Sequence, residues 1–253
     1  MPSKRELTKR YTDNFAVKLV AYYDPLANNG WYEHSELETQ DWVLENVGKD
    51  WVIFDCGAHI GYYSMLFSHC APDGKVYAFE PCELTCQYFR TNIKWNKDNK
   101  HDYKNIQLVQ AALGSEVIRD VEETLWFSGQ GEDGFGKTEG IYDFTTIDAF
   151  CQDHDIQRLD LLKSDVDAWD YELLLGARET IERFKPIIIV EVNYALGWRG
   201  YGDKDMEKFV REIGYTWTVL DRTMPSNWLM HPIYQEGVAR GRQPTESKGE
   251  KER

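Results

Sequence analysis

The segment "VIFDCGAHIGYYSMLF", residues 52–67, combines three local structures. Its first residues form an uninterrupted apolar run, which is typical of a strand buried on both faces. Gly57 and Gly61 follow Asp55 and allow a sharp turn in which the main chain can approach a ligand closely. Beyond Gly61 apolar residues recur with helical spacing. The segment therefore predicts a strand, a tight turn and a helix start, built for backbone contact with a nucleoside-bearing cofactor.

Strands and helices are expected to alternate through the rest of the chain. Apolar runs predict further strands at 75–80, 106–113, 159–166, 185–192 and 215–221. Amphipathic runs between them predict helices at 82–96, 145–155, 169–184 and 203–214. Because strands that are apolar on both faces alternate with helices, the pattern favours an α/β fold with a parallel sheet covered on both sides.

Three segments depart from this alternation. Residues 1–50 predict an N-terminal extension with a short extended stretch, "FAVKLVAYY", and one helix. Five glycines between 129 and 140 predict a flexible loop or an irregular hairpin. The tail at 236–253 has almost no apolar residues and is expected to be disordered. One domain, at 51–235, is therefore expected between two flanking segments.

Capping boxes are expected at the start of two helices. Ser35 and Glu38 stand three residues apart at the start of the N-terminal helix, 35–47. Thr145 and Asp148 have the same spacing at the start of the helix predicted from residue 145.

Composition excludes several classes of function. The formal net charge is −14, so a partner held through nucleic-acid phosphates is not expected. No window reaches the ~18 apolar residues of a membrane span. The N-terminus, "MPSKRELTKR", is charged and no apolar core follows it, which predicts a cytoplasmic protein without a secretory signal. Five cysteines form no CxxC and six histidines no HxxxH, so reduced thiols and no metal site are expected.

The glycine turn indicates which nucleoside is bound. A dinucleotide fingerprint reads GxGxxG, whereas this chain has DxGxxxG, with Asp55 in place of the first glycine. A carboxylate there disfavours a pyrophosphate and suits a ligand with a positive end, such as S-adenosylmethionine. The cofactor-binding candidates are Asp55, Gly57, Ala58 and Gly61. The alternative is that Asp55 only caps a helix and the glycines only turn the chain.

An acid at the end of the next strand supports cofactor binding. Glu80 ends "VYAFE" about twenty residues after the turn, where a carboxylate can bind both ribose hydroxyls. Nicotinamide-binding folds share this device, so Glu80 alone does not separate the two cofactors. Ala111, in the third strand, is a further cofactor-binding candidate.

The order of the motifs resembles one known family. The blocks "FDCGAHIGYYSMLF", "VYAFEP", "FTTIDAF", "LDLLKSDVDAWDYELLLGA" and "KPIIIVEV" occur in the order seen in FkbM-family methyltransferases. The resemblance covers roughly residues 33–220. It implies a Rossmann-like class I methyltransferase fold with a seven-stranded, mostly parallel sheet whose last strand is reversed. It also implies S-adenosylmethionine as cofactor and methylation of a hydroxyl of a sugar, glycan or natural product.

The chain departs from the family pattern at two places. His59 stands where the family usually has Asn. "KSDVDAWD", residues 163–170, stands where the family has a block like "KIDVEGAE", so the glycine is replaced and both glutamates are shortened. The resemblance places this block at the end of the fourth strand, facing the transferable methyl. The departures therefore concern the acceptor more than the cofactor.

Methyl transfer to an alcohol needs an aligned acceptor and removal of its proton. Asp165 is the first candidate for this catalytic role, Glu191 the second, and Asp167 and His59 follow. Each has a structural alternative. Asp165 would cap the next helix, Glu191 would pair with Lys163 or Arg199, and His59 would lie over the cofactor or donate to backbone.

Two further interpretations concern the surroundings of the methyl. Asp165, Asp167 and Glu191 together would be able to hold a divalent cation, although nothing else in the sequence calls for one. Several aromatic residues fall in segments that would roof the site. They are Trp169, Trp198, Tyr201 and Trp228.

Four functions remain open from the sequence. The first is O-methylation of a small molecule or glycan, and the second is N-methylation of a small amine at the same site. A protein that binds S-adenosylmethionine without turnover is the third, and a nicotinamide dehydrogenase the last. The acceptor and the oligomeric state are not predicted.

Overall fold

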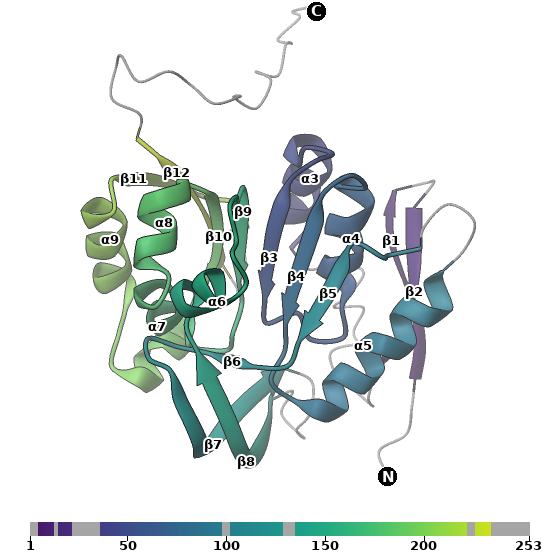
Figure 1. Cartoon of the computed structure of the whole chain (residues 1–253), viewed down its shortest axis with the longest axis horizontal. Coiled ribbons are helices and arrows are strands. Elements are labelled where there is room, and N and C mark those ends of the chain that lie inside the picture. The colour runs from purple at the N-terminus through teal and green to yellow at the C-terminus, as the bar shows by residue number, and fades with distance from the viewer. Residues whose placement is uncertain are drawn as a thin grey trace, which may run out of the picture.

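The computed structural model describes residues 5–12, 15–21, 36–97, 102–128, 135–221 and 226–233. Its main sheet consists of β3 (Val52–Cys56), β4 (Lys75–Phe79), β5 (Ile106–Val109), β9 (Leu161–Ser164), β10 (Ile187–Val192), β11 (Tyr215–Val219) and β12 (Ser226–Pro232). The seven strands lie in the order β11-β12-β10-β9-β3-β4-β5 (Figure 1). β12 runs antiparallel to β10 and β11, and the other neighbours pair in parallel. The seven-stranded, mostly parallel sheet with a reversed last strand is thereby confirmed.

Helices cover both faces of this sheet (Figure 1). One face carries α3 (Leu37–Asn46), α4 (Tyr62–Cys70) and α5 (Glu83–Asn96), and the other α6 (Ile147–Asp153), α7 (Asp170–Leu175), α8 (Arg178–Phe184) and α9 (Asp203–Glu212). Successive residues of a strand point alternately into two hydrophobic cores, one on each face of the sheet. Phe54 of β3 packs in the core under α6 to α9, and its neighbour Ile53 packs in the core under α3 and α4. This alternation explains why the strands read as continuous apolar runs.

The N-terminal segment forms a hairpin that packs on the main domain. β1 (Arg5–Thr12) pairs antiparallel with β2 (Phe15–Ala21). Phe15 and Val17 are buried in the same core as Val43 of α3 and Met65 of α4. The extended stretch predicted from residue 15 is thus β2, whereas β1, whose sequence is strongly charged, was not predicted.

A second, three-stranded sheet stands beside the main one. It consists of β6 (Ala112–Leu113), β7 (Ile118–Ser128) and β8 (Phe135–Thr145), with β7 and β8 as a long antiparallel hairpin. Of the two forms expected for the glycine-rich stretch, its described part, 135–140, has the hairpin form. The prediction of one strand over 106–113 was wrong, because the chain leaves the main sheet after Val109 and Ala112 pairs with Phe144 of β8.

The helix expected over 169–184 is two helices, α7 and α8, which are separated at Gly176. Gly176 packs against the backbone of Gly114, and an added Cβ would lie 2.2 Å from the Gly114 carbonyl oxygen. The carboxylate of Asp148 accepts hydrogen bonds from the amides of Glu179 (3.1 Å) and Thr180 (2.8 Å) in the first turn of α8. A tertiary contact and a cap from another helix therefore divide a segment whose pattern is continuous.

The capping box predicted at Thr145 and Asp148 was wrong, and the one predicted at Ser35 and Glu38 includes a residue outside the described part of the chain. The N-cap of α6 is Thr146, whose hydroxyl accepts from the amide of Ala149 (3.0 Å), because Thr145 is still the last residue of β8. The N-cap of α3 is Glu36, which has a positive φ of 53° and makes no side-chain cap bond. Ser35 lies outside the described residues, as do the tail at 236–253 and residues 129–134 of the glycine-rich stretch.

The reversed strand β12 was not predicted from its pattern, since the last strand expected was the one at 215–221, which is β11. β12 is buried between β10 and β11 and follows residues 222–225, which lie outside the described part of the chain. No helix in the described segments is long and apolar enough to cross a bilayer.

Asp148 offers a test of the α7–α8 division. Asp148→Ala removes the acceptor for two amides of α8, so the free energy of unfolding is expected to fall by about 1–2 kcal/mol. Urea denaturation followed by circular dichroism measures it. Asp153→Ala, at the exposed end of α6, is the matched control and is expected to stay within about 0.5 kcal/mol. Equal stability of the two variants would contradict the capping role.

Candidate active site

The turn after β3 brings two loops of the sheet into direct contact. Gly57 has a φ of +82°, and its amide and that of Ala58 donate to the carbonyl of Phe79 (3.0 and 2.8 Å). A Cβ on Gly57 would lie 1.7 Å from the carbonyl oxygen of Asp165. The close approach that requires this glycine is therefore made by the loop after β9. Gly61 caps α4 with a φ of +90° and packs against Phe89.

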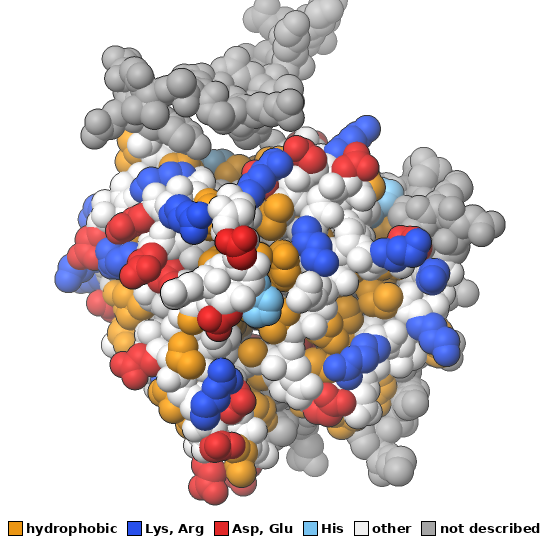
Figure 2. Space-filling model, in the orientation of Figure 1, with side chains coloured by type: hydrophobic (Ala, Val, Ile, Leu, Met, Phe, Trp, Pro, Cys, Tyr) orange, Lys and Arg blue, Asp and Glu red, His pale blue; other side chains and the backbone are white. Residues whose placement is uncertain are grey.

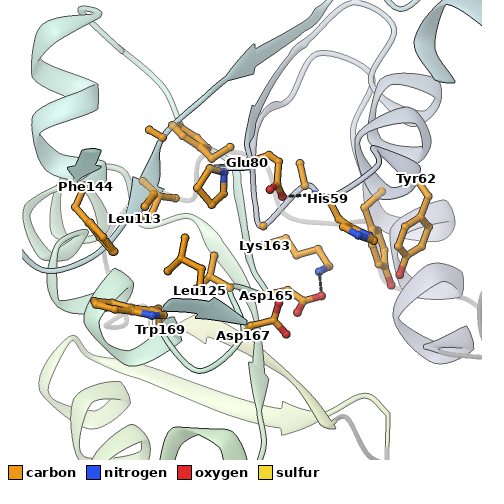
Figure 3. Close-up of a pocket in the computed structure, with 18 residues that line it drawn as sticks. His59, Tyr62, Glu80, Leu113, Leu125, Phe144, Lys163, Asp165, Asp167 and Trp169 are labelled. Carbon is orange, nitrogen blue, oxygen red and sulfur yellow. Dashed lines mark hydrogen bonds and ion pairs between the residues drawn. The ribbon is translucent and has the colours of Figure 1, made fainter. Parts of the chain in front are cut away.

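Glu80 joins the first two loops of the sheet. Its carboxylate accepts from the amide of His59 (3.0 Å, Figure 3) and from that of Cys82 (3.0 Å). Glu80 is 3% exposed. Burial raises the pKa of this carboxyl to about 7, although both amide hydrogen bonds favour the charged form. Each carboxylate oxygen has capacity for another donor, so Glu80 is able to accept from a ligand as well.

A buried ion pair stands at the end of β9. The ammonium of Lys163 lies 2.8 Å from Oδ2 of Asp165 and 4.5 Å from the ring centroid of Tyr63 (Figure 3 shows the pair). The Lys163 side chain is 1% exposed and that of Asp165 29%. Burial alone would lower the pKa of Lys163, but the carboxylates of Asp165, Glu36 and Asp55 outweigh it and raise this pKa. Lys163 is therefore charged, and Asp165 presents the accessible half of the pair.

These loops enclose a cavity at the carboxyl ends of the strands, where open α/β sheets bind their ligands. Figure 3 shows two dissimilar ends. The polar end carries His59, Tyr62, Lys163, Asp165 and Asp167, and the apolar end Leu113, Leu125, Phe144 and Trp169. Glu80 lies between them. The cavity therefore suits an elongated ligand with one flat apolar part and one charged part.

The structure brings most of the predicted site residues together. Gly57, Ala58, His59, Glu80, Ala111, Asp165 and Asp167 line this cavity. Three others lie outside the lining, namely Asp55, Gly61 and Glu191. Gly61 caps α4 and packs against Phe89, as described above.

Asp55 lies behind the turn. It is 1% exposed, and its Oδ2 accepts from the Ser64 hydroxyl (2.5 Å), while Oδ1 has no hydrogen-bond partner in the described structure. Burial raises the pKa of Asp55 to about 6, against the opposing effect of Lys163. Asp55 is therefore linked to the cavity through its electrostatic interaction with Lys163, which is a lining residue.

Glu191 is also buried, with 8% exposure. Burial and the charges of Asp165 and Asp170 raise its pKa well above the ordinary range. Neither suggested ion pair forms within the described residues, because Lys163 pairs with Asp165 and Arg199 with Glu172.

The loop after β9 is organised by Asp170 and not by Asp165. Oδ1 of Asp170 accepts from the hydroxyl of Ser164 (2.6 Å) and from the amide of Val166 (3.3 Å). Asp165 therefore does not cap the next helix, and its carboxylate remains turned to Lys163. No three acidic, histidine or cysteine side chains of the described chain are arranged to hold a metal ion. The interpretation of Asp165, Asp167 and Glu191 as a cation site is thus not supported.

Sequence reasoning missed the apolar end of the cavity. Leu113, Leu125 and Phe144 come from the second sheet, whose hairpin lies far along the chain from the glycine turn. Trp169 lines the cavity and Trp198 an adjoining cleft, as the predicted aromatic roof requires. Tyr201 instead packs on Tyr171, and Trp228 on Trp217. The Lys163–Asp165 pair could have been predicted from the sequence, because the two residues stand two positions apart at the end of β9.

The comparison with solved structures gives matches of low sequence identity. An FkbM methyltransferase of Methylobacillus flagellatus matches with a TM-score of 0.53 and 17% identity, over 73% of this chain and 44% of that one. The chain thus spans less than half of that protein's length. A precorrin-6y C5,15-methyltransferase of Geobacter metallireducens matches with a TM-score of 0.45 and 16% identity, over 77% and 86% of the two chains. A SAM-dependent methyltransferase of Aquifex aeolicus matches with a TM-score of 0.46 and 15% identity, over 83% and 98%.

The family model gives the more specific result. No curated protein sequence matches the chain significantly. The model described as methyltransferase FkbM domain matches residues 55–216, which is more than half of the chain and contains both loops of the cavity. The chain therefore belongs to the FkbM methyltransferase family.

Proposed function

We propose that this enzyme methylates a hydroxyl group of a small molecule, such as a sugar or a natural product. The observation that carries the proposal is the Lys163–Asp165 pair at the cavity wall. An alcohol must lose its proton as the new bond forms, and a positioned carboxylate is a suitable acceptor for it. The net charge of −14 argues against a nucleic acid as the acceptor.

The cavity fits the cofactor of the family. The apolar end, with Leu113, Phe144 and Trp169, suits an adenine base. Glu80 lies where the ribose hydroxyls would follow, and the carboxylate of Asp167 suits the positively charged methionine part. When bound, S-adenosylmethionine supplies an electrophilic methyl group. The residues of the chain supply the orientation and the proton acceptor.

Asp165 is the best-placed proton acceptor. Lys163 engages its Oδ2, and Oδ1 has no hydrogen-bond partner within the described residues. The ion pair therefore fixes the carboxylate in one orientation and leaves one oxygen for the acceptor hydroxyl. Glu191 is less suitable, because it does not line the cavity and burial raises the pKa of its carboxyl. The backbone amide of His59 donates a hydrogen bond to the carboxylate of Glu80, so His59 has a role in holding the turn.

The choice between hydroxyl and amine acceptors is open to a direct experiment. The enzyme is incubated with S-adenosylmethionine and either monosaccharides and polyhydroxylated natural products or small primary and secondary amines. Release of S-adenosylhomocysteine is then measured. Turnover with hydroxyl acceptors is the expected result. Turnover with amines alone would replace this proposal by N-methylation, in which the acceptor loses its proton before transfer.

Asp165→Asn is expected to lower kcat at least about 100-fold, because the amide cannot accept the proton. The affinity for S-adenosylhomocysteine, measured by calorimetry, is expected to change less than about threefold. Asp167→Asn, two residues away in the same loop, is the matched comparison and is expected to retain more activity. A kcat equal to that of the unsubstituted enzyme would remove Asp165 from the mechanism.

Glu80→Gln is expected to weaken S-adenosylhomocysteine binding at least about tenfold at pH ~8. With a pKa of about 7, Glu80 is ionised above neutrality and protonated below it, so it accepts ribose hydroxyls better at higher pH. The affinity of the unsubstituted enzyme should therefore rise between about pH 6 and 8, and Glu80→Gln should flatten this dependence.

Glu83→Gln, at an exposed position at the start of α5, is the matched control and should behave as the unsubstituted enzyme does. Substitution of Gly57 is a poorer test, because any side chain there collides with the loop after β9 whether or not a ligand is bound. Equal affinities of Glu80→Gln and the unsubstituted protein would show that Glu80 does not contact the cofactor.

A further inference from the structure

A second cleft opens beside the cofactor cavity. Residues 167–169, in the loop after β9, lie between the two, and Asp167 and Trp169 line both. One wall of the cleft comes from the β7–β8 hairpin, with Glu123, Thr124 and Glu139. The other wall comes from the 3-10 helix η1 (Tyr194–Arg199), which follows β10. The cleft is therefore adjacent to Asp165 without belonging to the cofactor cavity.

Arg199 is held rigidly in this cleft. Its Nε donates to Oε1 of Glu172, a carboxylate that is 6% exposed. Its guanidinium carbon lies 3.3 Å from the ring centroid of Trp169, so the planar group stacks on the indole. The Arg199 side chain is nevertheless 29% exposed. Two independent contacts thus fix a charged group that still reaches the cleft.

The contact with Glu172 leaves part of the guanidinium unused. A carboxylate and an arginine often form two parallel hydrogen bonds, but here only Nε takes part. The second oxygen of Glu172, Oε2, is buried without a hydrogen-bond partner in the described structure. The two terminal nitrogens of Arg199 likewise make no hydrogen bond with the described residues. Four N–H donors are therefore free for a molecule in the cleft.

The charges of the cleft restrict what it binds. Glu123, Glu139 and Asp167 contribute three carboxylates, and the charge of Arg199 is already balanced by Glu172. Figure 2 shows acidic side chains gathered over the β7–β8 hairpin, at the lower end of the view, where Glu122 and Glu139 are exposed. An anionic ligand would be repelled. A hydroxyl both donates to carboxylates and accepts from a guanidinium, so a neutral molecule with several hydroxyls matches this set.

We propose that this cleft is the acceptor subsite and that Arg199 is a positioning residue in it. It takes a neutral, hydroxyl-rich acceptor, to which Arg199 donates hydrogen bonds, and it rejects anionic analogues of the same shape. The exposed indole of Trp198, at the rim of the cleft, covers the apolar face of that acceptor. This inference rests on the proposed methylation of a hydroxyl group, because it assigns the binding site of that hydroxyl's carrier.

The test uses two probes that differ in charge but not in ring shape. The full-length protein is saturated with S-adenosylhomocysteine and titrated with methyl α-D-glucopyranoside or with D-glucuronate, and binding is followed by saturation-transfer NMR. The neutral glycoside is expected to bind at least about tenfold more tightly than the glucuronate. Tighter binding of the glucuronate, or no binding of the neutral glycoside, would overturn the assignment of the cleft.

Three variants then test the role of Arg199. Arg199→Gln is expected to weaken glycoside binding about tenfold, and Arg199→Lys by less, because lysine keeps the charge but loses the fork of donors. Arg178→Gln is the matched control. Arg178 also pairs with a glutamate, Glu212, and lies over an aromatic ring, Phe209, but it belongs to α8 and does not line the cleft.

Two readouts separate positioning from mere structural support. The affinity for S-adenosylhomocysteine should stay within about twofold in all three variants. With a hydroxyl acceptor that supports turnover, Arg199→Gln should raise KM about tenfold and leave kcat nearly unchanged. Unchanged KM and glycoside affinity in Arg199→Gln would overturn this inference and leave hydroxyl methylation standing. Turnover with amines alone would overturn the proposed function, whatever Arg199 does.

Discussion

The site depends on one buried cation. Lys163 has almost no solvent contact, so its ammonium is stable only because carboxylates from three parts of the chain surround it. Asp55 comes from β3, Asp165 from the loop after β9, and Glu36 from the N-cap of α3. The Lys163 ammonium, which compensates these three carboxylates, also orients Asp165. Of the three acids, Asp165 alone lines the cavity. The position of the Asp165 carboxylate therefore depends on the balance between Lys163 and the three acids around it.

The N-terminal segment takes part in that balance. Glu36 accepts from the hydroxyl of Tyr62 (2.5 Å) and from Nδ2 of Asn227 (2.6 Å), and so connects α3 with α4 and β12. The hydroxyl of Tyr11 in turn donates to the carbonyl of Tyr62 (2.5 Å). The family match begins only at residue 55, after Glu36 and Tyr11. Residues outside the matched region thus hold Tyr62, which lines the cavity.

Much of the main sheet could be predicted from local pattern. β3, β4 and β10 are continuous apolar runs, because helices cover both faces of the strands, and such runs are recognisable without a partner. β12 and the hairpin of β7 and β8 were harder, since their pairing partners stand elsewhere in the sequence. The division of α7 from α8 depends on Gly114 and Asp148, neither of which belongs to that segment. Local periodicity carries no information about such contacts.

At the site, the chemistry of individual positions could be predicted from local sequence. The glycine turn, the acid at Glu80 and the block with Lys163 and Asp165 are short-range patterns, and the sheet topology brings them to one edge. Which of these groups face the cavity, and which lie behind it, depends on contacts between distant parts of the chain. Asp55 and Glu191 looked equivalent to Glu80 and Asp165 as carboxylates at strand ends, yet they are buried outside the lining. The difference arises because side-chain direction and burial depend on what packs above each strand end, and those neighbours come from distant segments of the chain.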